Sequence, residues 1–110
     1  MRSDKERLID IDTFLKKILS EYNQLKFDSD ETFRYGLLKY LEIIGEASRT
    51  LREYTRQSSP KVEWQQIIGF RNIIVHQYHD LDWDEIKDII ENDLEPLLLE
   101  IESLILKNEK

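Results

Sequence analysis

Apolar residues recur at spacings of three and four along most of the chain, which is the pattern of amphipathic helices. The first such helix is predicted to begin near Ser3 or Asp4, where Ser3 and Glu6 can form a capping box. The segment Phe27-Asp28-Ser29-Asp30 interrupts the pattern, and Ser29 or Asp30 can cap the helix that follows. The apolar stripe of this first helix consists of Leu8, Ile11, Leu15, Ile18, Tyr22 and Leu25, broadened by Phe14 and Leu19.

A second helix is predicted from about Glu31 to Tyr54, and its middle carries small residues. These small residues are Gly45, Ala47 and Ser48. Because a glycine inside a helix costs roughly 1 kcal/mol relative to alanine, we expect another helix to pack closely at this point. The apolar stripe consists of Phe33, Leu37, Tyr40, Leu41, Ile44, Ala47, Leu51 and Tyr54.

A central helix is predicted from about Val62 or Glu63 to about Gln77. It follows a loop in which Pro60 prevents a helix from continuing. At about 100° per residue its apolar side chains surround the whole helix axis. A helix that is apolar on all sides is buried on all sides. One subunit of 110 residues hardly supplies that cover, so we expect a second chain to cover part of it. The apolar residues are Ile67, Ile68, Phe70, Ile73, Ile74 and Val75.

The last helix is predicted to begin after Asp82, which with Glu85 has the pattern of a capping box. Pro96 falls within this helix and is expected to kink it, because its ring removes a donor and crowds the preceding turn. From residue 84 to residue 102 there are eight acidic residues and one lysine, so this face repels phosphates. The apolar stripe consists of Ile86, Ile90, Leu94, Leu97, Ile101 and Leu104.

The composition indicates one all-α domain over residues 1–110. Three Gly and two Pro, with abundant Leu, Ile, Glu and Lys, favour helix over sheet. Hydrophobic residues make up 40% and charged residues 35%, as in helical bundles with wide solvent-exposed faces. The absence of cysteine excludes disulfides and thiolate metal sites.

The net charge and the hydropathy narrow the classes of function. A formal charge of −7 repels nucleic acid at long range, so a nucleic-acid role must rest on a local site. The N-terminal segment lacks the apolar core of a signal peptide. No apolar run reaches the roughly 20 residues that cross a bilayer. We expect a soluble, cytoplasmic protein.

Polar residues interrupt the apolar central helix and are the candidates for chemistry. Arg71, Asn72, His76 and Tyr78 lie, together with His79, within one arc of about 160° on the helical wheel. An arginine or histidine buried without a partner is costly. Each of them therefore has a local partner or serves a ligand.

Each of these residues also has a purely structural interpretation. Arg71 can form an ion pair with Glu46, with Glu63 or with the acidic last helix. His76 can be a hydrogen-bonded histidine of the core. Tyr78 can be a boundary aromatic whose hydroxyl lies in water.

Together, an arginine, a histidine and a tyrosine in one arc suit chemistry on a phosphate. Arginine is a permanent donor to non-bridging phosphate oxygens, and histidine can move a proton near neutral pH. With His76 and Arg71, a ribose 2′-hydroxyl can attack its neighbouring phosphate without a metal ion. His76 and His79 have the spacing of metal ligands, but no Glu or Cys completes a set, so we expect no metal site.

The segment from Arg71 to Tyr78, RNIIVHQY, is an Arg-x-x-x-x-His-x-Tyr motif with an Asn directly after the Arg. It resembles the HepT family of the HEPN superfamily, the toxin half of type VII HepT/MntA-type toxin–antitoxin pairs. The similarity covers nearly the whole chain, most strongly from Tyr40 to Leu99. It is supported by the segments IGEA at 44–47, VEW at 62–64, IGF at 68–70 and DLEPL at 93–97.

The resemblance implies an antiparallel bundle of four main helices that forms a homodimer or a higher assembly, with a shared cleft lined by both motifs. It implies a metal-independent endoribonuclease without a cofactor, in which Arg71 and His76 are catalytic and Asn72 supports them. It also implies a partner, a minimal nucleotidyltransferase antitoxin that adenylylates Tyr78. An anionic adenylate on Tyr78 would compete for the guanidinium of Arg71 and so silence the toxin.

Two other functions stay open at the level of sequence. The first is a non-catalytic subunit that holds a nucleotide or a substrate for a two-component nucleotidyltransferase. The second is a structural helical dimer in which Arg71 and His76 only satisfy neighbouring groups.

Overall fold

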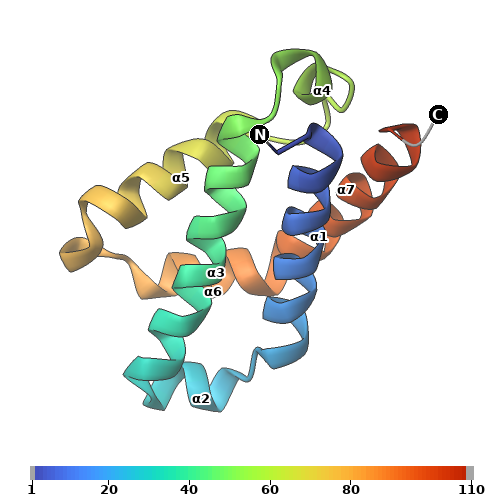
Figure 1. Cartoon of the computed structure of the whole chain (residues 1–110). Coiled ribbons are helices and arrows are strands. Elements are labelled where there is room, and N and C mark those ends of the chain that lie inside the picture. The colour runs from blue at the N-terminus through green and yellow to red at the C-terminus, as the bar shows by residue number, and fades with distance from the viewer. Residues whose placement is uncertain (1, 109–110) are drawn as a thin grey trace.

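The structure, a computed structural model, describes residues 2–108, and its regular elements are all helical (Figure 1). No β-strand occurs within these residues, so the predicted all-α class is confirmed. The elements are α1 (Asp4–Glu21), α2 (Gln24–Ser29), α3 (Glu31–Thr50), α4 (Glu53–Gln57), α5 (Trp64–His76), the 3₁₀ helix η1 (Tyr78–Asp80), α6 (Trp83–Asn92) and α7 (Leu94–Asn108).

Helix α1 lies at the centre of the bundle. It runs antiparallel to α3 and packs on another side against α7, whereas α5 packs against α3 (Figure 1). The inward side chains of α1 are fully buried because they fill the space between α3 and α7. The buried core includes Leu8, Ile11, Leu15, Ile18, Leu37, Leu41, Ile44, Ile86, Ile90, Ile101 and Leu104.

The predicted helix starts are confirmed by their caps. The side chains of Ser3, Asp30 and Asp82 each accept a hydrogen bond from the backbone N–H three residues further on, at 3.1, 3.2 and 3.1 Å. At Ser3 the reciprocal bond of a capping box is also present, because its backbone N–H donates to Glu6 at 3.0 Å. These caps satisfy amide groups that have no partner within the helix.

The first stripe ends earlier than predicted. Helix α1 stops at Glu21, and Asn23 caps the short helix α2 by accepting a hydrogen bond from the backbone N–H of Lys26 at 2.9 Å. Leu25, which the periodicity placed in the stripe, lies in α2 with 80% of its surface exposed. The cap at Asn23 starts a new helix in a new direction. Residues after it therefore no longer continue the apolar stripe of α1.

The second helix ends at Thr50 and not near Tyr54. A short helix, α4, follows it, and Tyr54 is 81% exposed rather than part of the stripe. The cause is a side chain from further along the chain, because the guanidinium of Arg56 covers the carbonyl end of α3. Its Nη1 donates at 3.2, 3.1 and 2.7 Å to the carbonyl oxygens of Ser48, Arg49 and Leu51.

The last helix is broken before Pro96 rather than kinked at it. Helix α6 ends at Asn92, and α7 begins at Leu94 in a different direction (Figure 1). Pro96 therefore lies in the first turn of α7, where a residue needs no backbone donor. The fourth of the predicted main helices consists of α6 and α7.

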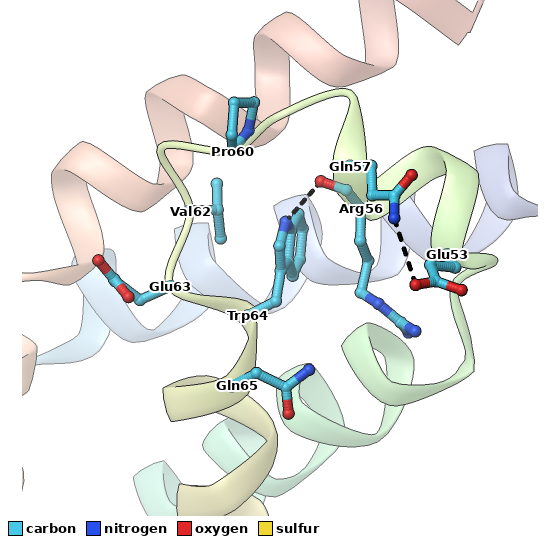
Figure 2. A pocket seen from close by; sticks show the side chains of 8 residues that line it. All are labelled: Glu53, Arg56, Gln57, Pro60, Val62, Glu63, Trp64 and Gln65. Atoms are coloured by element: carbon cyan, nitrogen blue, oxygen red, sulfur yellow. Dashed lines mark hydrogen bonds between the residues drawn. The ribbon is translucent and has the colours of Figure 1, made fainter.

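The start of α5 is fixed by Trp64. Its indole Nε1 donates to the backbone carbonyl of Arg56 at 2.9 Å (Figure 2). It also donates to the backbone carbonyl of Ser59 at 3.2 Å. A surface pocket of about 360 Å³ opens beside it, between α4 and the first turn of α5. None of the predicted site residues lines this pocket. Its lining consists of Glu53, Arg56, Gln57, Pro60, Val62, Glu63, Trp64 and Gln65.

Within one chain α5 is covered on one side only, which agrees with the expectation that a single subunit does not bury this helix on all sides. Trp64 and Ile74 are its buried residues, and Ile73 is 44% exposed. The reason is that α5 rests on α3 at the edge of the bundle (Figure 1). Cover by a second chain stays a prediction.

The length and the hydropathy of a helix decide whether it could cross a membrane. Among residues 2–108, none of the helices combines the length and the apolar character that crossing a bilayer requires.

Asp4 ties the start of α1 to the segment after α3. Its carboxylate is buried and accepts hydrogen bonds from the Thr55 hydroxyl and from Arg52 Nε, the latter at 3.0 Å. Burial raises the pKa of Asp4, but the hydrogen bonds from Thr55 and Arg52 and the charge of Arg52 outweigh it, so the pKa lies below its ordinary value. The ionised form of Asp4 therefore stabilises the fold.

We expect Asp4→Asn to lower the free energy of unfolding at pH 7 by about 1–3 kcal/mol, because Thr55 and Arg52 lose an ionised acceptor. A depressed pKa stabilises the fold fully above the unfolded value of about 3.9, and this contribution disappears as the pH falls through the folded value. The difference between wild type and variant should therefore shrink in strong acid. Urea unfolding at pH 7 and in strong acid measures this difference, with Asp80→Asn, at an exposed aspartate, as the control; a difference independent of pH would contradict the assignment.

Candidate active site

Helix α5 crosses α3 at Gly45, and the residue that lies over this glycine is Arg71. A Cβ atom added to Gly45 would lie 2.3 Å from Arg71 Cβ and 2.8 Å from Arg71 Cγ. No other residue type fits there without moving the helices apart. The close helix approach predicted from the small residues of α3 is confirmed.

The guanidinium of Arg71 is held on two sides. Its Nη2 lies 2.9 Å from Glu46 Oε2, and its Nη1 donates to Asn72 Oδ1 at 3.1 Å. Nε is buried without a hydrogen-bond partner among the described residues, and 22% of the side chain is exposed. Of the ion pairs that the sequence left open for Arg71, the structure selects the one with Glu46.

Glu46 is the anionic centre of this arrangement. Arg49 Nη2 also donates to it, and Arg49 Nε lies 3.3 Å from its second oxygen. The hydrogen bonds from Arg49 lower the pKa of Glu46; burial opposes this, and the charge of Arg71 adds to the lowering. Glu46 is therefore ionised at neutral pH and able to orient Arg71. From the sequence alone, Glu46 was only one of several possible partners for Arg71. The signal that could have selected it is its position directly after Gly45, the glycine at which the two helices cross.

His76 and Asn72 lie on the outer side of α5. His76 is the last residue of the helix and is exposed, so the interpretation as a core histidine is wrong. Asn72 is exposed as well, and its carbonyl oxygen brings one edge of the Arg71 guanidinium toward the same outer face. This side of α5 therefore presents an imidazole and a guanidinium edge.

Tyr78 follows α5 in η1 and is 50% exposed. Its ring lies against the imidazole of His79, with 4.0 Å between the ring centroids. The exposure agrees with the boundary aromatic that the sequence allowed, and it leaves the side chain accessible. Among residues 2–108, no three His, Cys, Asp or Glu side chains gather where they could hold a metal ion.

One chain does not bring all the predicted site residues to one hollow. Arg71 lines a groove of about 410 Å³ along α1 and α3, together with Glu46, Ala47, Thr50 and others. None of Asn72, His76 and Tyr78 lines that groove. Asn72 is thus the link between the half-buried Arg71 and the exposed face that carries His76.

The fold and the site define an all-α protein with an Arg-x-x-x-x-His-x-Tyr motif on an outer helix. Residues 8–104 match the family model described as Ribonuclease HepT-like. The chain therefore belongs to the HepT-like ribonuclease family, and the assignment made from the motif is confirmed.

Curated relatives support this membership. "Putative RNase MJ1380" of Methanocaldococcus jannaschii is 36% identical over 93 residues, which cover 84% of this chain and 82% of the relative. "Putative RNase MJ0127" of the same organism is 31% identical over 101 residues, covering 89% and 84%. "Probable ribonuclease HepT" of Thermococcus cleftensis is 27% identical over 96 residues, covering 81% and 87%. No solved structure gave a significant match.

We expect Gly45→Ala to lower the free energy of unfolding by about 1–3 kcal/mol, because the new methyl group overlaps Arg71 Cβ, which cannot rotate away. Gly36→Ala in the same helix is the matched control, since nothing lies within 4 Å of a Cβ atom there. The control should be neutral or stabilised by up to about 1 kcal/mol. Chemical unfolding measures both, and equal behaviour of the two variants would exclude the tight crossing.

Proposed function

We propose that this chain is the toxin of a HepT/MntA-like toxin–antitoxin pair and that it cleaves RNA as a metal-independent endoribonuclease. Membership of the HepT-like ribonuclease family supports the reaction class. The observation that carries the assignment to residues is the pairing of Arg71 with Glu46 and Asn72 on the helix that exposes His76. A held guanidinium and an exposed imidazole suit the two tasks of the reaction, which are to stabilise negative charge on the phosphate and to move a proton.

In the proposed reaction His76 and Arg71 are the catalytic residues and Asn72 supports them. His76 takes the proton of a ribose 2′-hydroxyl while the oxygen of that hydroxyl bonds to the adjacent phosphorus. The bond from phosphorus to the 5′-oxygen breaks, which leaves a 2′,3′-cyclic phosphate, and the departing 5′-oxygen takes a proton from water. His76 then returns its own proton to the solvent. Arg71 donates to the non-bridging oxygens as negative charge develops on them. Glu46 and Asn72 hold Arg71 in place, which limits the reorganisation that the step requires.

The proposed active form is a homodimer that pairs the outer faces of α5. Ile73 is 44% exposed on that helix, and several of its other apolar residues are only half-buried. A second copy would bury this surface and place two motifs beside one cleft. In a single chain Arg71 lines the groove along α1 and α3 and His76 does not, so assembly would also complete the site.

We expect His76→Ala to reduce RNA cleavage by about 100-fold or more, the usual effect of removing a general acid–base group. Because His76 is exposed, the free energy of unfolding should change by less than about 0.5 kcal/mol. Arg71→Ala should abolish cleavage as well, and both variants should relieve the growth arrest that inducible expression of the parent causes. RNA cleavage is measured with purified protein and a single-stranded RNA, and growth arrest is measured in a toxicity assay.

His79→Ala is the matched control, because His79 is also exposed but is not one of the two proposed catalytic residues, Arg71 and His76. It should retain cleavage and toxicity. If His76→Ala and Arg71→Ala remain as toxic and as active as the parent, the proposed ribonuclease mechanism is wrong. If the protein binds nucleotides but neither the parent nor any variant cleaves RNA, the chain is the non-catalytic subunit of a nucleotidyltransferase.

Regulation is proposed to act on Tyr78. A minimal nucleotidyltransferase antitoxin would transfer an adenylate to its hydroxyl, which lies on a half-exposed side chain two residues after His76. The added phosphate is an anion close to the motif, and it would compete with RNA for Arg71. Modification would therefore block the site without unfolding the protein.

We expect Tyr78→Phe to remain toxic and to resist neutralisation by the antitoxin, because the acceptor hydroxyl is absent. The parent incubated with the nucleotidyltransferase and ATP should gain the mass of one adenylate and lose cleavage activity. Tyr35→Phe, another exposed tyrosine, is the control and should still be neutralised. Equal neutralisation of Tyr78→Phe would place the modification elsewhere.

A further inference from the structure

Two carboxylates at the groove along α1 and α3 each form ion pairs with two arginines. Asp4 pairs with Arg7, whose Nη1 lies 3.2 Å from Oδ1, and with Arg52, whose Nε lies 3.0 Å from Oδ2. Glu46 is shared in the same way. Because one carboxylate cannot neutralise two guanidinium groups, each cluster keeps an excess of positive charge. The Glu46 cluster consists of Glu46, Arg49 and Arg71, and the Asp4 cluster consists of Asp4, Arg7 and Arg52.

Both clusters contribute side chains to the groove of about 410 Å³, since Arg71, Glu46 and Arg7 line it. The other charged side chains that line the groove are balanced. Arg2 forms an ion pair with Asp10, and Lys39 Nζ lies 3.5 Å from Glu42 Oε2. The groove is therefore locally positive on a chain with a formal charge of −7. Such a local excess of cations can attract a polyanion that the whole chain repels.

An exposed aromatic ring lies beyond the Asp4 cluster. Tyr54 is 81% exposed, more than any other aromatic side chain among residues 2–108. It belongs to α4, which lies at the end of the bundle where α1 begins and α3 ends (Figure 1). The hydroxyl of the next residue, Thr55, donates to Asp4, so α4 is held beside this cluster. Cations along a groove and an exposed aromatic ring are the two features with which proteins bind single-stranded nucleic acid.

We propose that this groove holds a single strand of RNA, with one phosphate on Arg71, a second on Arg52 and one base stacked on Tyr54. The inference rests on the proposed ribonuclease and states how its substrate is held outside the motif helix. The side chain of Arg52 is 74% exposed. Its Nε donates to Asp4, whereas its two terminal nitrogens have no hydrogen-bond partner among the described residues. That free edge can donate to two oxygens of one phosphate.

The chemistry of the groove favours an unpaired strand. A base that stacks on Tyr54 has to be free of its complementary strand, because the faces of paired bases are covered by their neighbours. Arg52 and Tyr54 touch no reacting atom in the proposed reaction, so they act on binding and not on the chemical step. Their effect is expected in KM, whereas that of His76 is expected in kcat.

The test measures the binding of a single-stranded oligonucleotide by fluorescence anisotropy, with the full-length protein. The 2′-hydroxyls of this RNA are methylated, so the proposed reaction cannot cleave it. We expect Tyr54→Ala to weaken binding by about fivefold or more, and Tyr54→Phe to bind like the parent because the ring remains. Arg52→Gln should also weaken binding, and it should reduce the slope of log affinity against log salt concentration by about 0.7, the value for one phosphate of a single strand.

The controls are Leu25→Ala and Lys26→Gln in α2, at the opposite end of the bundle from α4 (Figure 1). Leu25 is 80% exposed and so matches Tyr54 in exposure, and Lys26 is an exposed cation. Both variants should bind like the parent. Thermal unfolding of Tyr54→Ala should match that of the parent, since its side chain is exposed. With cleavable RNA, Tyr54→Ala should raise KM by about the factor by which it weakens binding and leave kcat within about twofold.

The remaining outcomes separate this inference from the proposed function. If the parent cleaves RNA but Tyr54→Ala and Arg52→Gln bind the oligonucleotide as tightly as the parent does, the binding groove is wrong and the ribonuclease stands. A parent that binds no oligonucleotide at low salt, or an equal loss in the α2 controls, also overturns the groove. If the two variants lose binding but the parent cleaves no RNA, the groove stands and the ribonuclease is wrong. Normal RNA binding with lost neutralisation by the nucleotidyltransferase would assign the surface to that protein and overturn the inference.

Discussion

The contact between Gly45 and Arg71 decides the geometry of the site. With no side chain at Gly45, the backbone of α5 comes so near α3 that the Arg71 side chain begins directly on the glycine. This contact fixes the rotation of α5 about its own axis. Once Arg71 faces α3, a helix of about 100° per residue places Asn72 at about 100° and His76 at about 140° from it. The exposure of both residues follows from that rotation.

The same contact joins packing to electrostatics. Glu46 follows Gly45 in the chain, so the helix turn that admits Arg71 also supplies its carboxylate partner at 2.9 Å. Ion pairs at a surface contribute little to stability, but a half-buried guanidinium without an anion would be costly. The pair is better understood as a device that keeps Arg71 in one orientation. Asn72 then turns one edge of it toward the outer face.

The parts of the fold that sequence predicted correctly are those set by local interactions. The caps at Ser3, Asp30 and Asp82 involve groups only three residues apart, so their pattern in the chain is sufficient. The end of α3 was predicted too late in the chain, because it depends on groups outside the helix. Arg56 donates hydrogen bonds to the carbonyls at the end of α3, and Asp4 accepts a hydrogen bond from Arg52, which follows the helix. Periodicity contains no information about such tertiary contacts. In the same way, the carboxylate that pairs with Arg71 depends on where α5 crosses α3, although residue types and spacing were sufficient to single out Arg71 as a candidate.

An acidic ribonuclease must gain its specificity from position rather than from general attraction to RNA. Each chain offers one guanidinium on the motif helix, and Glu46 already neutralises much of its charge. Contacts with few phosphates give weak binding that depends only slightly on salt. Catalysis benefits only from interactions that strengthen in the transition state. An Arg71 that meets the phosphate when negative charge accumulates on it, and otherwise remains with Glu46, fits that requirement in the proposed mechanism.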